Sequence, residues 1–505
     1  MENELKNQKN LLRGLHFDDF RSIFPKRIPT FYEDKKMQNN LPRPKVAYIG
    51  LSLELYLSTS GPEILTWQRA FDNWSKKLSL FADICCKKMA FTPSDVAEVE
   101  QLISGKDIDA IVLSAVSYTP SMLIVPFLKK MGLPVVIWST QDSAVISEKY
   151  EPVDLTRNHT VQGIHDITNV LFQSGIKYNI VTGHWEDEKT LQRLNDTLRI
   201  VRAARAAKKI RVLALGGAFE GMGDFDYDPE NLKNAWGPEA VALSAEEFLS
   251  VLPSISEDEI EAQRLKDLDF FEVMPDLSVE VHREAIRRKF AVEKLLKENN
   301  ANAFTMNFLN LQSPSFGQLP FYAINTLMAE GIGYAGEGDV LRAAAMRQLV
   351  ELTGDANFSE IYTVDFKRDL FFMSHMQECS IGIARRDRKV RLKNMPFWVN
   401  KTNYAGMFFT AEPGDYTLVC ITPAPGGTFK MVAFTGTVPD LPVLETYNRA
   451  YWLFRPQRPV EEILDDYSLA GGAHHLSAVC GHRISELKAL ADCLGFQFEN
   501  IDSGR

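Results

Sequence analysis

The chain has 505 residues and a formal net charge of −10, with 56 Lys and Arg against 66 Asp and Glu. This length predicts about three domains of ordinary size, and the hydrophobic fraction of 45% excludes a disordered or fibrous chain. The acidic balance, without a long basic block, argues against a nucleic-acid partner. Because no apolar run reaches the length of a membrane span and the start lacks a signal-peptide pattern, we expect a cytoplasmic protein without a membrane partner.

Residues 1–44 are polar and interrupted by prolines, and we interpret them as an N-terminal extension. Three short apolar runs then follow, KVAYIGLSL, IDAIVLSAV and LPVVIWST, with helix-length segments at 63–79, 93–104 and 120–131 around them. Such runs are typical of buried parallel strands. The alternation predicts a Rossmann-like N-terminal domain over residues 45–175, with a doubly wound parallel sheet.

The same pattern resumes with KYNIVTG, a long helix and RVLALGG, and later with a helix over 278–298 that leads into AFTMNF. Ser244 and Ser256 each stand three residues before a glutamate, which predicts two helix starts. We therefore expect a second Rossmann-like domain over residues 176–353. From residue 354 to 505, strand-like segments separated by Pro and Gly turns predict a β-rich C-terminal domain, either a barrel or a sandwich.

Residues 331–336 read GIGYAG and match the G-x-G-x-x-G pattern of dinucleotide-binding turns. The preceding segment PFYAINTLMAE has helical spacing, so a helix and not a strand leads to Gly331, and we expect no NAD binding. One alternative is a helix-ending glycine followed by a flexible loop, with Glu337 and Asp339 beside the first turn of the next helix. Another is that the glycines around Glu337 leave its carboxylate open to a metal ion or a sugar.

Histidine and the carboxylates are the remaining candidate chemistry, because the six cysteines are too few and too scattered for a disulfide framework and predict reduced, buried thiols. A lone histidine is more often a core or surface residue than a ligand. Three places stand out: His184 in TGHW, His375 in MSHM, and the pair in AGGAHH. The pair is the most ligand-like, since the preceding glycines permit a turn that points an imidazole inward.

Four segments, EGIGYAGEGD, FSEIYT, MSHMQEC and LAGGAHH, occur in this order and at separations that resemble the active-site segments of the bacterial L-arabinose isomerase family, within the L-fucose and L-arabinose isomerase superfamily. IVTGHWED and AFTMNF are similar to further stretches of that family. The resemblance runs from about residue 45 to the end and indicates a divergent member.

The resemblance implies a metal-dependent aldose–ketose isomerase that acts through a cis-enediol, with two Rossmann-like domains and a barrel-like C-terminal domain. It assigns the metal ligands as Glu337, Glu360, His375 and His475, with both glutamates also moving protons, and it leaves His474 outside the ligand set. Two carboxylates and two imidazoles suit Mn²⁺, the expected metal, or Co²⁺. Similar enzymes are homo-oligomers, commonly hexamers, with active sites near subunit boundaries.

The segments expected to face the substrate depart from the family pattern. GLSLELY keeps Leu55 and Tyr56 but loses a glutamine, AFEGMGDF replaces an Asn-Met-Arg-Glu segment, and Phe308 is followed by Leu and Asn where the family has Glu and Asp. We expect substrate contacts from Tyr56, Gln141 and Phe308. The sugar is thus L-arabinose or a related monosaccharide. The alternative is a non-catalytic sugar-binding or regulatory protein of the same fold, in which the intact ligand set would be idle.

Overall fold

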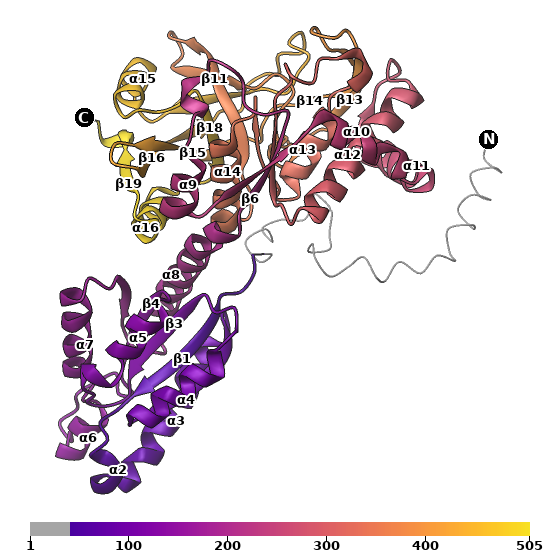
Figure 1. Cartoon of the computed structure of the whole chain (residues 1–505). Coiled ribbons are helices and arrows are strands. Elements are labelled where there is room, and N and C mark those ends of the chain that lie inside the picture. The colour runs from indigo at the N-terminus through magenta and orange to yellow at the C-terminus, as the bar shows by residue number, and fades with distance from the viewer. Residues whose placement is uncertain (1–40, 505) are drawn as a thin grey trace.

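The computed structural model describes residues 41–504, so most of the predicted N-terminal extension lies outside the described residues. Figure 1 shows an N-terminal body joined through the long helix α8 (Glu188–Ala206) to a larger body that contains the rest of the described chain. Within residues 41–504, every helix is too short or too polar to cross a membrane.

The N-terminal body is built on a five-stranded sheet of order β2-β1-β3-β4-β5, in which every neighbouring pair is parallel. Its strands are β1 (Lys45–Leu51), β2 (Asp83–Ala90), β3 (Ala110–Ala115), β4 (Val135–Ser139) and β5 (Tyr178–Thr182). The three apolar runs of the sequence are β1, β3 and β4, as predicted. Strand β2 was not predicted, because Lys87 and Lys88 interrupt its apolar pattern; in the structure they pair with acidic side chains of neighbouring helices.

Helices cover both faces of this sheet, which confirms the doubly wound arrangement. They are α2 (Tyr56–Thr59), α3 (Gly61–Leu78), α4 (Pro93–Ile103), α5 (Val125–Met131), α6 (Pro152–Arg157) and α7 (Val161–Gln173). One apolar cluster lies on each face, and Trp67 and Trp74 of α3 are among the largest buried side chains. The helix expected over 120–131 is divided at Ile124, and Pro126, which has no N–H to donate, lies in the first turn of α5.

The strand β5 belongs to the first sheet, where it pairs with β4 from Val135↔Tyr178 to Ser139↔Thr182. The predicted boundary between 175 and 176 assigns this strand to the central domain, whereas its pairing joins it to the first sheet. The pattern of strand, helix and strand is the same on both sides of the boundary, so the sequence alone does not separate the two sheets. Helix α8 contributes to both bodies, because Leu194 and Leu198 join the core of the first sheet and Ala203 joins that of the larger body.

A second, four-stranded parallel sheet has the order β10-β9-β6-β7. Its strands are β6 (Arg211–Leu215), β7 (Glu239–Leu243), β9 (Ala303–Met306) and β10 (Gly333–Gly336). The surrounding helices are α9 (Pro229–Asn231), α10 (Ala245–Val251), α11 (Glu257–Phe270), α12 (Val279–Glu298), α13 (Phe321–Ala329) and α14 (Val340–Thr353). Ser244 and Ser256 accept hydrogen bonds at the starts of α10 and α11, as predicted.

The GIGYAG segment is preceded by helix α13, as predicted, but residues 333–336 form strand β10 and not a flexible loop. A Cβ on Gly333 would lie 2.6 Å from the carbonyl oxygen of Ala343 and from the Cβ of Arg347. Glycine at this position therefore allows α14 to pack directly on β10.

The C-terminal region is a closed barrel with neighbours in the order β15-β18-β11-β12-β17-β16, and the β15–β16 pairing completes the ring. Its strands are β11 (Asn357–Asp365), β12 (Leu370–Ser374), β15 (Gly414–Ala424), β16 (Thr428–Val438), β17 (Trp452–Pro456) and β18 (His475–Cys480). Strand β19 (Gln497–Asn500) adds to β16 in parallel, and helices α15 (Val460–Leu469) and α16 (Ile484–Leu494) lie in the same region. Of the two predicted forms, the structure adopts the barrel.

The central and C-terminal regions are continuous with each other. A small sheet joins β13 (Arg391–Pro396) and β14 (Asn403–Phe408) to β8 (Glu272–Val273) of the central region. One cluster of buried side chains also runs through both regions, from Ala203 to Ile501. The barrel is thus fixed against the second parallel sheet.

Candidate metal and sugar site

Four strands bring the predicted ligands together where the second sheet meets the barrel. Glu337 follows β10, Glu360 lies in β11, His375 follows β12, and His475 begins β18. Strand β11 lies between β12 and β18, and Glu360 is in register with Ser374 on one side and with His475 on the other. The barrel register therefore places three of the ligands side by side, and the end of β10 adds the fourth.

The ligand atoms lie at separations that suit one metal ion. The Nε2 atoms of His375 and His475 are 3.0 Å apart, and Nε2 of His375 lies 3.8 Å from Glu360 Oε2 and 4.0 Å from Glu337 Oε1. Nε2 of His475 lies 3.9 Å from Glu337 Oε2. With bonds of about 2.1 Å, two ligands of one ion are about 3.0 Å apart at right angles and about 4.2 Å apart when opposite. The donor set and its spacing therefore fit a divalent cation.

Two groups of three side chains in the described chain have ligand atoms within 4.8 Å of one another. One contains Glu360, His375 and His475, and the other contains Glu337, His474 and His475. All four predicted ligands are included, and His475 belongs to both groups. His474, which the resemblance leaves outside the ligand set, lies beside Glu337.

Both ligand imidazoles are oriented by buried carboxylates. Nδ1 of His375 forms an ion-pair contact with the carboxylate of Glu378, and Nδ1 of His475 lies 3.0 Å from Oδ2 of Asp339. Since a carboxylate only accepts, each Nδ1 carries a proton, and in the neutral imidazole Nε2 is then the atom that offers a lone pair to the centre. Metal-binding histidines are commonly held in this way. Tyr334 of β10 extends the arrangement, because its hydroxyl donates to Oε1 of Glu378 at 2.5 Å.

The charges around the cluster shift its pKa values in different directions. Burial disfavours a charged imidazole at His375, but the carboxylates of Glu378, Glu360 and Glu337 raise its pKa to about 9. Burial lowers the pKa of His475 to about 4. Burial raises the pKa of Glu360, whereas at Glu337 the neighbouring imidazoles outweigh burial and lower the pKa. The two glutamates thus have different affinities for a proton.

The backbone around Glu337 is unusual. Glu337 has a φ of 60°, a left-handed conformation that costs a non-glycine residue roughly 1–2 kcal/mol. A Cβ on Gly336 would lie 2.6 Å from Oε2 of Glu378, and one on Gly338 would lie 2.1 Å from the carbonyl oxygen of Gly217. One of the two alternatives from the sequence was that these glycines leave the Glu337 carboxylate open to a ligand. In the structure the glycines allow close contacts within the protein.

Residues 218–225, the segment that departs from the family pattern, form a wall of this site. The backbone N–H of Phe219 donates to the carbonyl oxygen of Glu337 at 3.0 Å, and the ring of Phe225 stacks on His475 at 5.0 Å. Asp224 bonds through Oδ2 to Nδ1 of His474 at 2.7 Å. Sequence reasoning missed Asp224, Glu378 and the histidine contact of Asp339. Their signal in the sequence is that each lies in a segment compared above with the family pattern: AFEGMGDF, MSHMQEC or EGIGYAGEGD.

The predicted substrate contacts are in two places. Phe308 follows β9, and its ring is 6.2 Å from that of Phe219 in the wall. Tyr56 packs against Trp67 at 5.2 Å, and Nε2 of Gln141 donates to the carbonyl oxygen of Ser143. Figure 1 shows α2, which contains Tyr56, at the opposite end of the molecule from β11 and β18. Within one chain, Phe308 lies near the ligands and Tyr56 does not; Gln141 follows β4 of the same N-terminal body.

His184 also stays away from the ligand cluster. Its Nε2 lies 3.2 Å from the carbonyl oxygen of Asp142, so it contacts the loop next to Gln141.

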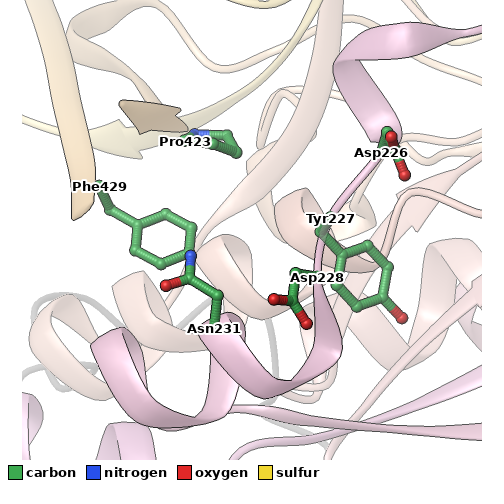
Figure 2. Close-up of a pocket in the computed structure, with 6 residues that line it drawn as sticks. All are labelled: Asp226, Tyr227, Asp228, Asn231, Pro423 and Phe429. Carbon is green, nitrogen blue, oxygen red and sulfur yellow. The ribbon is translucent and has the colours of Figure 1, made fainter. Parts of the chain in front are cut away.

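A cavity of about 410 Å³, shown in Figure 2, is also separate from the predicted metal ligands. Its lining residues are Asp226, Tyr227, Asp228, Asn231, Pro423 and Phe429.

Comparison with known proteins identifies the family. Sequence models for the L-arabinose isomerase central domain and the L-arabinose isomerase C-terminal domain match residues 232–355 and 355–497. An L-arabinose isomerase of Shouchella clausii is 24% identical over 441 residues, which cover 84% of this chain and 88% of that protein. One of Yersinia enterocolitica is 26% identical over 408 residues, which cover 77% and 79%.

An ABC transporter solute-binding protein of Burkholderia multivorans, among solved structures, aligns at 15% identity with a TM-score of 0.16, over 61% of this chain and 93% of that chain. The matched domains, the two parallel sheets and the barrel define a sugar isomerase. The two adjoining matches together span more than half of the chain, which belongs to the L-arabinose isomerase family as a divergent member.

Proposed function

We propose that the protein is a metal-dependent aldose–ketose isomerase that converts L-arabinose to L-ribulose, or a related aldose to its ketose, through a cis-enediol. The observation that carries the proposal is the convergence of two imidazole Nε2 atoms and two carboxylates, with each Nδ1 held by a further carboxylate. The names of the relatives, L-arabinose isomerase, support it.

Glu337, Glu360, His375 and His475 would hold the metal ion. The mixture of oxygen and nitrogen donors favours Mn²⁺ over Ca²⁺, which prefers oxygen ligands alone. A bound divalent cation stabilises the negative charge that develops on the enediolate oxygens.

The two glutamates would move the protons. Isomerisation takes a proton from C2 of the aldose and returns one to C1, while hydroxyl protons exchange. Glu337 and Glu360 reach the imidazole cluster from different strands, so one carboxylate can accept the C2 proton while the other returns a proton, and the two can alternate as base and acid. Neither step needs a nicotinamide.

The test of this function is a panel of aldoses and ketoses, scored for interconversion. We expect no turnover after treatment with EDTA and dialysis, and recovery with Mn²⁺ that exceeds recovery with Ca²⁺. An untreated sample passed through the same dialysis is the control. Full activity in the chelated sample would contradict the proposal, and so would sugar binding without any turnover, which is the behaviour of a sugar-binding or regulatory protein.

We further propose a homo-oligomer, with a hexamer expected, in which the N-terminal body of one chain covers the ligand cluster of another. Exposed apolar side chains follow β1 and β4, including Leu55 (58% exposed), Val145 (72%) and Ile146 (81%). Tyr56 and Gln141 lie in the same segments. Apolar groups gathered in this way are typical of protein contacts, and such a contact would bring both residues to the sugar.

Light scattering is therefore expected to give a mass above that of the 57.1 kDa monomer. A mixture of Glu337→Gln and Gln141→Ala chains should recover about a quarter of wild-type activity when subunits exchange, because that share of sites would combine two intact halves. Mixing Glu337→Gln with Glu360→Gln is the matched control, since both changes lie in the same half of the site. An active monomer, or a mixture no better than its components, would contradict the assembly.

A further inference from the structure

The hydroxyl of Tyr334, in the GIGYAG segment, begins a chain of polar contacts that leads to a predicted metal ligand. It donates to Oε1 of Glu378 at 2.5 Å, and the other oxygen of the same carboxylate contacts Nδ1 of His375. All three side chains are buried. Within residues 41–504, Oε1 of Glu378 has no hydrogen-bond donor other than Tyr334. The tyrosine therefore supports the carboxylate that orients His375.

The ring of Tyr334 has a fixed position. Its centroid lies 4.8 Å from that of Phe304 in β9 and 5.8 Å from that of Phe358 in β11. Its backbone N–H donates to Sδ of Met346 in α14 at 3.3 Å, and the side chain is 0% exposed. Because packing on several sides holds the ring, the hydroxyl cannot leave Glu378 without a shift of the surrounding core.

Gly336 leaves the space that this pair of side chains occupies. Residues two apart in a strand face the same side, so Gly336 and Tyr334 both face Glu378. A Cβ on Gly336 would lie 2.6 Å from Oε2 of Glu378 and 2.7 Å from Cε1 of His375, which is closer than a Cβ atom tolerates. The backbone of Gly336 is outside the left-handed region, so space and not backbone conformation requires glycine here.

We propose that Tyr334 is a positioning residue that acts through Glu378 on His375, and that it raises the affinity of the site for its metal ion. Gly336 provides the room for this contact, so the GIGYAG segment supports a metal ligand. The proposal rests on the proposed function and concerns one determinant of metal binding. Without the hydroxyl, Oε1 of Glu378 would be buried without a donor, which disfavours the charged carboxylate beside His375.

The test measures Mn²⁺ affinity by calorimetric titration of metal-free protein. Tyr334→Phe removes the hydroxyl and keeps the ring, and we expect it to bind Mn²⁺ about 10-fold more weakly than the wild type. Gly336→Ala should weaken binding at least as much, because its Cβ displaces both Glu378 and His375. At saturating Mn²⁺, kcat of Tyr334→Phe should fall by less than the Mn²⁺ affinity, because the tyrosine acts on a ligand and not on the sugar.

Tyr322→Phe is the matched control for a purely structural effect. Tyr322 is also buried, and its hydroxyl donates to Oδ2 of Asp267 at 2.7 Å. That carboxylate contacts His282, which is not one of the predicted ligands. Both phenylalanine variants should lower Tm of the metal-free protein, because each removes a donor from a buried carboxylate. Only Tyr334→Phe should also reduce the rise in Tm that Mn²⁺ produces.

A double variant tests whether Tyr334 acts through Glu378. Tyr334→Phe/Glu378→Gln should bind Mn²⁺ no more weakly than Glu378→Gln alone, because the two residues contribute to the same contact with His375. Additive losses would overturn the proposed route.

The remaining outcomes separate the positioning role from the function. Unchanged Mn²⁺ affinity in Tyr334→Phe, or an equal loss in Tyr322→Phe, would overturn the role of Tyr334 and leave the isomerase intact. Tyr334→Phe decides the proposal if Gly336→Ala does not fold. Wild-type protein that neither binds Mn²⁺ nor isomerises any aldose would refute the proposed function, and the positioning role with it.

Discussion

Replacing Glu337 or Glu360 by glutamine is expected to lower kcat by a factor of about 100 to 10,000 while leaving part of the metal bound. Glutamine keeps the shape of the side chain and one carbonyl oxygen as a donor, but it cannot take a proton. Both positions are close to the paired imidazoles, and both carboxylates are only partly exposed. The expected loss of kcat therefore reflects lost proton transfer and not a loss of folding.

The measurement combines kcat for the best sugar with the metal content of each purified variant. Glu461→Gln, at an exposed position in the first turn of α15, is the control and should match the wild type in both. A Glu337→Gln enzyme with an undiminished rate would contradict the proposed role of that carboxylate. A variant that is inactive and also empty of metal would show that binding, and not proton transfer, was lost.

The predicted ligands could be found from sequence because each lies in a short, distinctive segment. Glycines flank Glu337, and two glycines precede the histidine pair, so the sequence alone indicates both segments as candidate sites. Residue types alone did not link Glu360 or His375 to them. That step came from the family resemblance, because the meeting of these residues depends on the register of β11 with β12 and β18.

The supporting carboxylates could not be predicted in the same way. Asp224 and His474 are 250 residues apart, and nothing local to either one indicates the other. Glu378 and Asp339 are two of 66 acidic residues, and their contacts with the ligand histidines depend on how β10, α14 and the barrel pack. Such contacts are set by tertiary structure, so a single sequence does not contain a readable signal for them.

Strands with continuous apolar runs were predicted from the sequence. Strands β10 and β2 were not, because packing and ion pairs, and not an apolar run, account for their residues. Strand β10 consists of Gly-Tyr-Ala-Gly and has little β-propensity, yet close packing against α14 requires small residues there. Strand β2 is an edge strand whose lysines pair with acidic side chains of helices.

The substrate contacts expected from Tyr56 and Gln141 stay predictions, because they depend on a second chain of the proposed homo-oligomer.

Removal of a ligand imidazole should act through metal affinity. We expect His475→Ala to weaken Mn²⁺ binding by at least about 100-fold, and His375→Ala to weaken it by less. His475 is 0% exposed and belongs to both possible metal groups, whereas His375 belongs to one. Excess Mn²⁺ should recover part of the activity of either variant, because both glutamates remain, and should recover little in the glutamine variants.

Calorimetric titration with Mn²⁺ and kcat at increasing Mn²⁺ concentration measure this effect. A ligand that binds only the folded state raises Tm according to its concentration relative to Kd, so the Mn²⁺-dependent rise in Tm should shrink in His475→Ala. His474→Asn is the matched control from the adjacent position, and its metal content should stay near normal, since Nδ1 of His474 faces Asp224 and the ring is not part of the group that holds Glu360 and His375. A His474 variant empty of metal beside a fully loaded His475 variant would reverse the assignment of the histidine pair.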